Sequence, residues 1–193
     1  MGAAHDAGTL TARAVKARLR EREDPVRAAG EASFFKTGPG QYGEGDQFLG
    51  LSVPEQRRVA QQYRELPFVD LAALLQSPTH EDRFTALEIL VMQYETGDAK
   101  TREGVFRFYL QHTDRINNWD LVDTSARYIV GEHLRDRSRA RVYRLARSRS
   151  LWERRIAMVA THAWIATGDA GDAYAIAGLL LDDTHDLICE AAG

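Results

Sequence analysis

The chain has 193 residues, of which 44% are hydrophobic and 27% charged, and its formal net charge at pH 7 is -3. This length suits one large domain or two small ones, and the charge balance gives no sign of a polyanion partner. No apolar run approaches the length of a membrane span, and the single cysteine, Cys189, excludes a disulfide framework. The N-terminus also lacks an apolar signal core, so we expect a cytoplasmic protein without membrane contact.

Helical patterns fill most of the chain, because apolar residues recur three and four positions apart and strand patterns are nearly absent. Pro54 and the pair Asp24–Pro25 suit helix starts, whereas Gly97–Asp98 and Gly168–Asp169 suit helix ends. The sequence therefore predicts an all-α fold, with helices at about residues 9–22, 24–35, 54–64, 67–76, 80–95, 99–112, 118–134, 138–148, 150–166, 170–181 and 184 onward.

A glycine-rich segment, KTGPGQYGEGD, runs from Lys36 to Asp46, and its glycines at positions 38, 40 and 43 match the dinucleotide-binding pattern G-x-G-x-x-G. That pattern binds a pyrophosphate only when a strand precedes it and a helix follows at once. Here the preceding residues predict a helix, and Pro39 removes a backbone N–H that a phosphate would need. We therefore interpret the segment as a structured loop.

The later helices recur at a regular interval. Helix starts fall near His80, Asn117, Leu151 and Thr184, with a second helix in each interval. Two helices per period are typical of an α-solenoid of HEAT-like repeats, which buries its apolar faces by stacking, although an irregular helical bundle remains an alternative. A solenoid curves, and we expect its candidate site on the concave side.

The segment INNWDLVDTSA contains the first candidate site residues. Asn117 or Asn118 can cap a helix, on which Trp119 and Asp123 share one face. Asp123 lies among apolar and small residues, where a carboxylate is costly unless it faces a groove or a partner. Arg154 and Arg155 begin the corresponding later helix, so an arginine could lie beside Asp123. Alternatively, Trp119 serves helix packing and Asp123 a salt bridge.

Positive charge is concentrated between Arg127 and Arg155, where ten arginines and no lysine stand against three acidic residues. The planar guanidinium suits bidentate contact with phosphate, so this block favours a nucleic-acid partner. On the predicted helix 138–148, one stripe collects Arg137, Arg141, Arg144 and Arg147. Alternatively, the stripe is a solvated face paired with acids elsewhere. In the solenoid interpretation, the arginines make the concave groove basic.

Three segments in order, FFKTGPGQYGEGDQFLGLSVPEQRR, NNWDLVDTSA and LWERRIAM, resemble the AlkD-like family of DNA alkylation repair glycosylases, which are built from HEAT-like repeats. The resemblance covers the chain from Phe34 onward. It implies that Trp119 and Asp123 match the family's catalytic tryptophan and aspartate. It also implies that Arg155 contacts DNA near the lesion. The partner would be double-stranded DNA with alkylated purines, bound by a nucleoid-associated monomer.

The C-terminus departs from the family pattern. Relatives continue past a KAxGW segment into a further helical region, whereas this chain ends at CEAAG, with Glu190 where a basic residue is common. We therefore expect one HEAT-like domain, residues 1–193, that is truncated at its C-terminus relative to the family.

The expected reaction is release of a purine alkylated at N3 or N7. Such a base already carries a positive charge and leaves without a general acid, while a carboxylate stabilises the oxocarbenium character of the sugar and can orient or deprotonate water. Asp123 fits this role, Trp119 fits cation–π contact with the lesion, and Arg155, with Arg154 and the stripe, fits the phosphates. No cofactor or metal is expected. The alternative is an inactive HEAT-type scaffold that binds nucleic acid or a protein.

Overall fold

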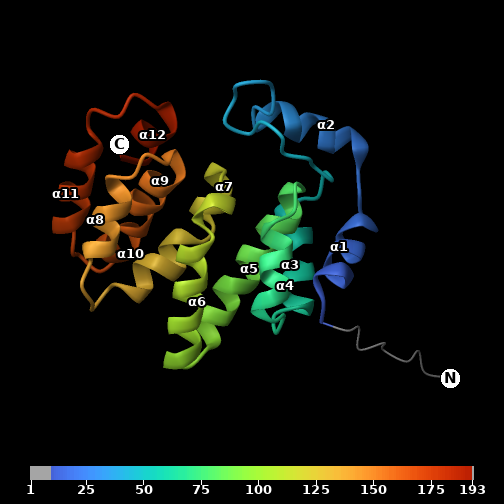
Figure 1. Cartoon of the computed structure of the whole chain (residues 1–193), viewed down its shortest axis with the longest axis horizontal. Helices are drawn as coiled ribbons and strands as arrows, with labels where there is room; N and C mark the ends of the chain where they lie inside the picture. Colours follow the sequence, from blue (N-terminus) through green and yellow to red (C-terminus); the bar gives the residue numbers. More distant parts are fainter. Residues whose placement is uncertain (1–9, 193) are drawn as a thin grey trace. The chain divides into compact units, whose positions relative to one another are not determined.

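A computed structural model describes residues 10–192, and Figure 1 shows its helices in chain order. Towards the N-terminus these are α1 (Ala12–Arg20), α2 (Pro25–Phe34), α3 (Val53–Gln62), α4 (Phe68–Leu75), α5 (His80–Thr96) and α6 (Ala99–Gln111). They are followed by η1 (Thr113–Arg115), α7 (Trp119–Asp123), η2 (Arg127–Gly131), α8 (Ala140–Ala146), α9 (Leu151–Ala160), α10 (His162–Ile165), α11 (Gly171–Leu180) and α12 (Asp186–Ala192).

Residues 10–192 contain no β-strand, only an isolated bridge between Gln47 and Thr79, so the predicted all-α class is confirmed. None of the described helices combines the length and apolar character that a membrane span requires. The chain divides into two compact units, Met1–Ile89 and Leu90–Gly193, with the boundary inside α5. The concave groove that the sequence predicts depends on how these units are arranged, so it stays a prediction. The prediction that residues 1–193 form a single domain also stays a prediction.

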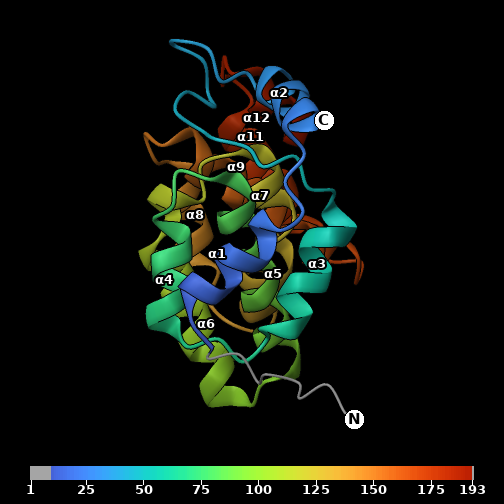
Figure 2. The same cartoon turned by 90° about the vertical axis from the view of Figure 1, so that its right-hand side faces the viewer.

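In the first unit, α1 packs against α3 and α4, and Figure 2 shows it between them. Its apolar face is fully buried at Val15 and Leu19. The start of α1 is fixed twice, because Thr11 caps the helix and the backbone N–H of Ala12 donates to Asp70 on α4 at 2.8 Å. Position 9, where the predicted first helix began, lies outside the described residues.

The glycine-rich segment is a packed loop, as predicted. Gly40 has a φ of 75°, a conformation that favours glycine. A Cβ at Gly43 would stand 2.3 Å from the carbonyl oxygen of Phe35, so only glycine fits there. The N–H of Gly38 donates to Gln41 Oε1 at 2.9 Å and that of Gly40 to Glu44 Oε2 at 2.8 Å. The loop therefore satisfies these donors with its own side chains.

In the second unit, α9 is the central helix. It packs against α7, η2, α8, α11 and α12, and six consecutive residues, Arg155–Ala160, are buried. Figure 1 shows α9 between α7 and α8, which both contact it. Gly131 of η2 permits close approach to α9, because a Cβ there would stand 2.3 Å from Ala160 O. The indole N–H of the fully buried Trp164 donates to Gly131 O at 2.8 Å.

The predicted helix over residues 118–134 is interrupted, which corrects the sequence interpretation. Helix α7 ends at Asp123, Thr124 and Ser125 form a turn, and η2 is π-helical. The Ser125 hydroxyl donates to Leu121 O at 2.6 Å and lies 2.9 Å from the hydroxyl of buried Tyr109. A serine bonded back to the preceding turn disturbs the regular ladder, and a π-bulge absorbs the change. The predicted helix 150–166 is likewise broken, at Thr161.

Candidate functional site

Asp123 ends the short helix α7, whose start is set by Asn118. The Asn118 side chain accepts the backbone N–H of Trp119 at 2.8 Å, so of the two predicted caps it is Asn118 that acts. Trp119 is half-buried and stands one turn before Asp123. Asp120 accepts the N–H of Leu121 at 2.8 Å and belongs to the first turn of α7. The turn at Thr124 and Ser125 leaves Asp123 at the exposed end of α7.

Arg155 of α9 is the expected arginine beside Asp123. Its Nε donates to Asp123 Oδ1 at 2.9 Å and its Nη2 to Oδ2 at 2.7 Å, which is a bidentate ion pair. The Arg155 side chain is 8% exposed, whereas that of Asp123 is 39% exposed. Arg155 also donates to the carbonyl oxygen of Leu187 on α12. The arginine therefore connects three helices from the inside, and the carboxylate faces outward.

A pocket of about 440 Å³ opens at this ion pair. Its wall combines residues of α7, η2, α9, α10 and α12, namely Asp123, Arg127, Tyr128, Arg155, Val159, His162, Glu190 and Ala191. Burial, and then the charges of Arg127 and Arg155, lower the pKa of His162, although Asp123 opposes this shift. The imidazole is consequently neutral at pH 7. The pocket thus offers an anchored carboxylate beside a neutral imidazole and cationic groups.

Sequence reasoning missed Arg127, Tyr128 and His162. Arg127 follows Asp123 by four residues, which is the spacing of one helix face, whereas Tyr128 follows it by five and lies in the π-helical η2. His162 follows Arg155 by seven residues, or about two turns. The spacing rule that paired Trp119 with Asp123 could have found Arg127 and His162, but it could not have found Tyr128. Trp119 is not one of the described residues that line the pocket.

Arg154 lies elsewhere in the unit. Its Nε donates to Asp183 Oδ2 at 2.6 Å, and its Nη1 donates to the carbonyl oxygens of Ser148 and Arg149 at 3.1 and 3.0 Å. These bonds tie α9 to the segments before α9 and after α11. The prediction that Arg154 binds DNA is untested, but this guanidinium already has partners within the chain.

The remaining predicted arginines, Arg141, Arg144 and Arg147, are exposed on α8 and at its C-cap. They do not line the pocket with Asp123. Arg137, which the stripe also included, precedes α8 and donates to His133 O. The structure therefore brings Arg155 to Asp123 and leaves the arginines of α8 on another surface.

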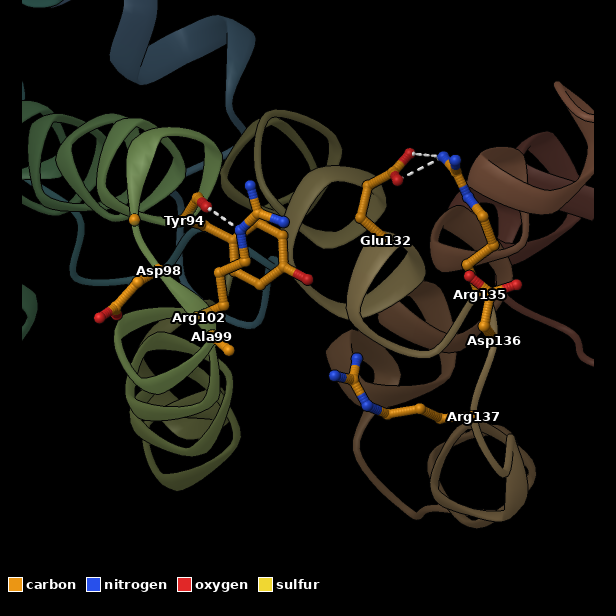
Figure 3. Close-up of a pocket in the computed structure, with 9 residues that line it drawn as sticks. Tyr94, Asp98, Ala99, Arg102, Glu132, Arg135, Asp136 and Arg137 are labelled. Atoms are coloured by element: carbon orange, nitrogen blue, oxygen red, sulfur yellow. Dashed lines mark hydrogen bonds and ion pairs between the residues drawn. The ribbon is translucent and has the colours of Figure 1, made fainter.

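Another hollow lies between the α5–α6 turn and the segment after η2 (Figure 3). Its arginines are engaged by the chain itself. Arg102 donates to Tyr94 O and Glu95 O at 3.0 and 3.1 Å, and Arg135 pairs with Glu132, as the dashed lines in Figure 3 partly show. Three acidic residues also line it, namely Asp98, Glu132 and Asp136. None of the predicted site residues is among the described residues that line this hollow, so the Asp123 pocket is the stronger candidate.

Comparison with known proteins identifies the family. The sequence profile described as "DNA alkylation repair enzyme" matches residues 15–193. The fold is similar to a solved structure described as a predicted DNA alkylation repair enzyme from Enterococcus faecalis, with a TM-score of 0.59 and 15% identity over 88% of this chain and 79% of that chain. No curated protein sequence matches. The profile match spans nearly the whole chain, and the chain therefore belongs to the DNA alkylation repair enzyme family.

Proposed function

We propose that the chain is a DNA glycosylase that hydrolyses the N-glycosidic bond of N3- or N7-alkylated purines in duplex DNA. The observation that carries this proposal is the ion pair of Asp123 and Arg155 at an open pocket. Membership of the DNA alkylation repair family supports DNA as the substrate. The finer assignment of reaction and lesion rests on the chemistry of the pocket.

Asp123 is the proposed catalytic carboxylate. Loss of the cationic base leaves oxocarbenium character on the deoxyribose, and a nearby carboxylate stabilises that charge and can orient or deprotonate the attacking water. Arg155 holds both carboxylate oxygens, so the group keeps its orientation before the substrate arrives. Preorganisation of this kind avoids a reorganisation cost during the reaction.

Trp119 is proposed to contact the cationic lesion or the sugar. It lies one helical turn before Asp123, and cation–π attraction from an indole contributes roughly 0.5 to 2 kcal/mol. The neutral His162 adds no positive charge to a pocket that must receive a cation. Arg127 stands at the pocket wall where a flanking phosphate could be bound.

The deciding experiment is release of free 7-methylguanine or 3-methyladenine from methylated duplex DNA, with the product bases separated by chromatography. Base release by the wild type and its loss in Asp123→Asn support the proposal. Binding of the duplex without any base release supports the other candidate, a scaffold without chemistry. The same ion pair also supports the scaffold as a second candidate, because Asp123 and Arg155 stabilise contacts among α7, α9 and α12.

A further inference from the structure

The exposed arginines of α8 form a surface of their own, here called the α8 arginine face and consisting of Arg141, Arg144 and Arg147. On the same helix the residues between them, Val142, Leu145 and Ala146, are buried. Helix α8 packs against α9 and α11, so its buried side meets these helices and the arginines lie on the solvent side. The arginine face is therefore a row along one side of the helix.

This face and the Asp123 pocket lie on different sides of α9. Arg155 and Val159, four residues apart, line the pocket from one face of that helix. The hollow beside the arginine face, of about 540 Å³, includes Glu153 of α9 together with Arg144 and Arg147. Glu153 precedes Arg155 by two residues, which is about 200° around an α-helix. One DNA phosphate therefore cannot touch both surfaces.

The charge of the α8 arginine face is not neutralised within the described part of the chain. Elsewhere in the arginine block, Arg135, Arg139, Arg154 and Arg155 each pair with an acidic residue. In residues 10–192 no ion pair is formed by Arg141, Arg144 or Arg147. The Arg147 guanidinium instead lies 5.9 Å from the Tyr143 ring centroid and donates to Tyr143 O at 3.0 Å. Glu153 is the one acid among the described residues that line the hollow, and it accepts a hydrogen bond from Thr113 at 2.7 Å.

The geometry of the face suits a nucleic-acid backbone. From Arg141 to Arg147 the helix rises about 9 Å. Along one strand of duplex DNA, phosphates rise about 3.4 Å each along the axis and also wind around it, so this row is long enough to reach about two of them. Guanidinium groups bind phosphate oxygens through paired N–H donors, which a lysine row would not do.

We propose that the α8 arginine face binds the phosphate backbone of a second segment of duplex DNA, apart from the segment whose lesion enters the Asp123 pocket. This inference rests on the proposed function only in taking duplex DNA as the ligand. One protein molecule would then hold two duplex segments on opposite sides of α9. The second contact is independent of base sequence and sensitive to salt, because it consists of phosphate contacts.

The test is the number of short undamaged duplexes bound per protein, measured by native mass spectrometry with the duplex in excess. The wild type is expected to bind two and the variant Arg141→Gln/Arg144→Gln/Arg147→Gln one. A matched control, Arg13→Gln/Lys100→Gln/Arg107→Gln, removes the same charge from exposed positions outside the block and is expected to keep two. Retention of helicity, checked by circular dichroism, shows that the substitutions leave the fold intact.

Three results would overturn the proposal: a wild type that binds one duplex, an arginine-face variant that still binds two, or a control variant that also drops to one. Binding of polyglutamate, measured with the same variants, distinguishes duplex DNA from an acidic protein as the partner of the arginine face. If the arginine-face variant loses polyglutamate binding but keeps both duplexes, the face serves an acidic protein and the DNA assignment is wrong. Alkylpurine release by the wild type is scored separately, so the glycosylase proposal and this one can fail independently.

Discussion

Arg155 holds both carboxylate oxygens of Asp123, at 2.9 Å from Nε to Oδ1 and 2.7 Å from Nη2 to Oδ2, and it is the buried member of the pair. The arginine is anchored on its other side by Leu187 O. A buried cation that holds a partly exposed carboxylate fixes the position of that carboxylate without covering it. The pair can therefore serve both the packing of α9 and the chemistry of the pocket.

Replacement of Asp123 by asparagine is expected to slow alkylpurine release while DNA binding persists. Asparagine keeps one oxygen that can accept from Arg155 but removes the charge that stabilises the transition state. The rate falls about tenfold for each 1.36 kcal/mol of stabilisation that is lost. Folding stability should fall by only about 1 kcal/mol, since the carboxylate is partly exposed and solvent screens the pair.

The matched control is Asp120→Asn, which removes a carboxylate from the first turn of the same helix. Its expected cost is roughly 0.3 to 1 kcal/mol of helix stability, with base release nearly unchanged. Release rates are compared in single-turnover assays on methylated duplex. Equal rates for both variants and the wild type would show that Asp123 has no catalytic role.

Replacement of Arg155 by lysine tests the positioning of Asp123. Lysine keeps the charge, but it cannot donate two parallel hydrogen bonds to a carboxylate and also reach Leu187 O in the same geometry. We expect base release to fall by about tenfold, equivalent to 1.36 kcal/mol, with a smaller change in duplex affinity. Affinity measured by fluorescence anisotropy beside the release rate separates the two effects. A rate equal to that of the wild type would mean that charge alone is sufficient at this position.

The helices could be predicted from the sequence because their apolar spacing and caps are local signals. The interruption after Asp123 could not, since it depends on Ser125 meeting the hydroxyl of Tyr109 from a different helix. Such a contact is visible only after the helices have packed. The π-helical η2 begins two residues after Ser125 and belongs to the same interruption of the helix.

The site was predictable in part. Helical spacing placed Trp119 and Asp123 on one face, and the recurring helix starts indicated an arginine nearby, but neither pattern distinguished Arg154 from Arg155. Adjacent residues on a helix point about 100° apart. Arg154 turns to Asp183, and Arg155 turns to Asp123. The choice depends on which face of α9 meets α7, which is a property of packing.

The double variant Arg141→Gln/Arg144→Gln is expected to weaken DNA binding with little regard to base sequence. Each lost phosphate contact should flatten the plot of log affinity against log salt by about 0.9. The measurement is duplex affinity by anisotropy at several salt concentrations. An unchanged affinity and slope would show that these side chains only face solvent.

Glu31 in the first unit is expected to make stability depend on pH. Burial first, and then the Glu81 carboxylate, raise the pKa of Glu31 to about 7 from 4.5. Between pH 4.5 and about pH 7, folding therefore takes up a proton at Glu31. The stability that the protonated Glu31 permits at low pH is lost as the pH rises through about 7. Glu31→Gln should remove this loss and stabilise the protein at pH 8 on the order of 1 kcal/mol, after discounting for partial exposure.

The measurement is urea unfolding of the wild type and Glu31→Gln at pH 5 and pH 8. Other groups titrate in this range, including His133 and His162, whose pKa values are lowered chiefly by burial. The difference between the two proteins cancels their contributions. If the stability gap between them is the same at both pH values, Glu31 does not carry the proton.

Gly131 is expected to be indispensable to the packing of η2 on α9. A Cβ at this position would stand 2.3 Å from Ala160 O and 2.8 Å from the Cβ of Ala163, and backbone on a buried helix cannot move aside cheaply. Gly131→Ala should therefore destabilise the second unit by about 3 kcal/mol and weaken the bond from Trp164 to Gly131 O.

Gly178→Ala is the control, because that glycine lies inside α11 and a Cβ added there would have no neighbour within 4 Å. Alanine favours an exposed helix interior by roughly 1 kcal/mol over glycine, so the control should be neutral or stabilising. Thermal unfolding followed by Trp fluorescence distinguishes the two, and a Gly131→Ala protein as stable as the wild type would mean that η2 and α9 can separate without cost.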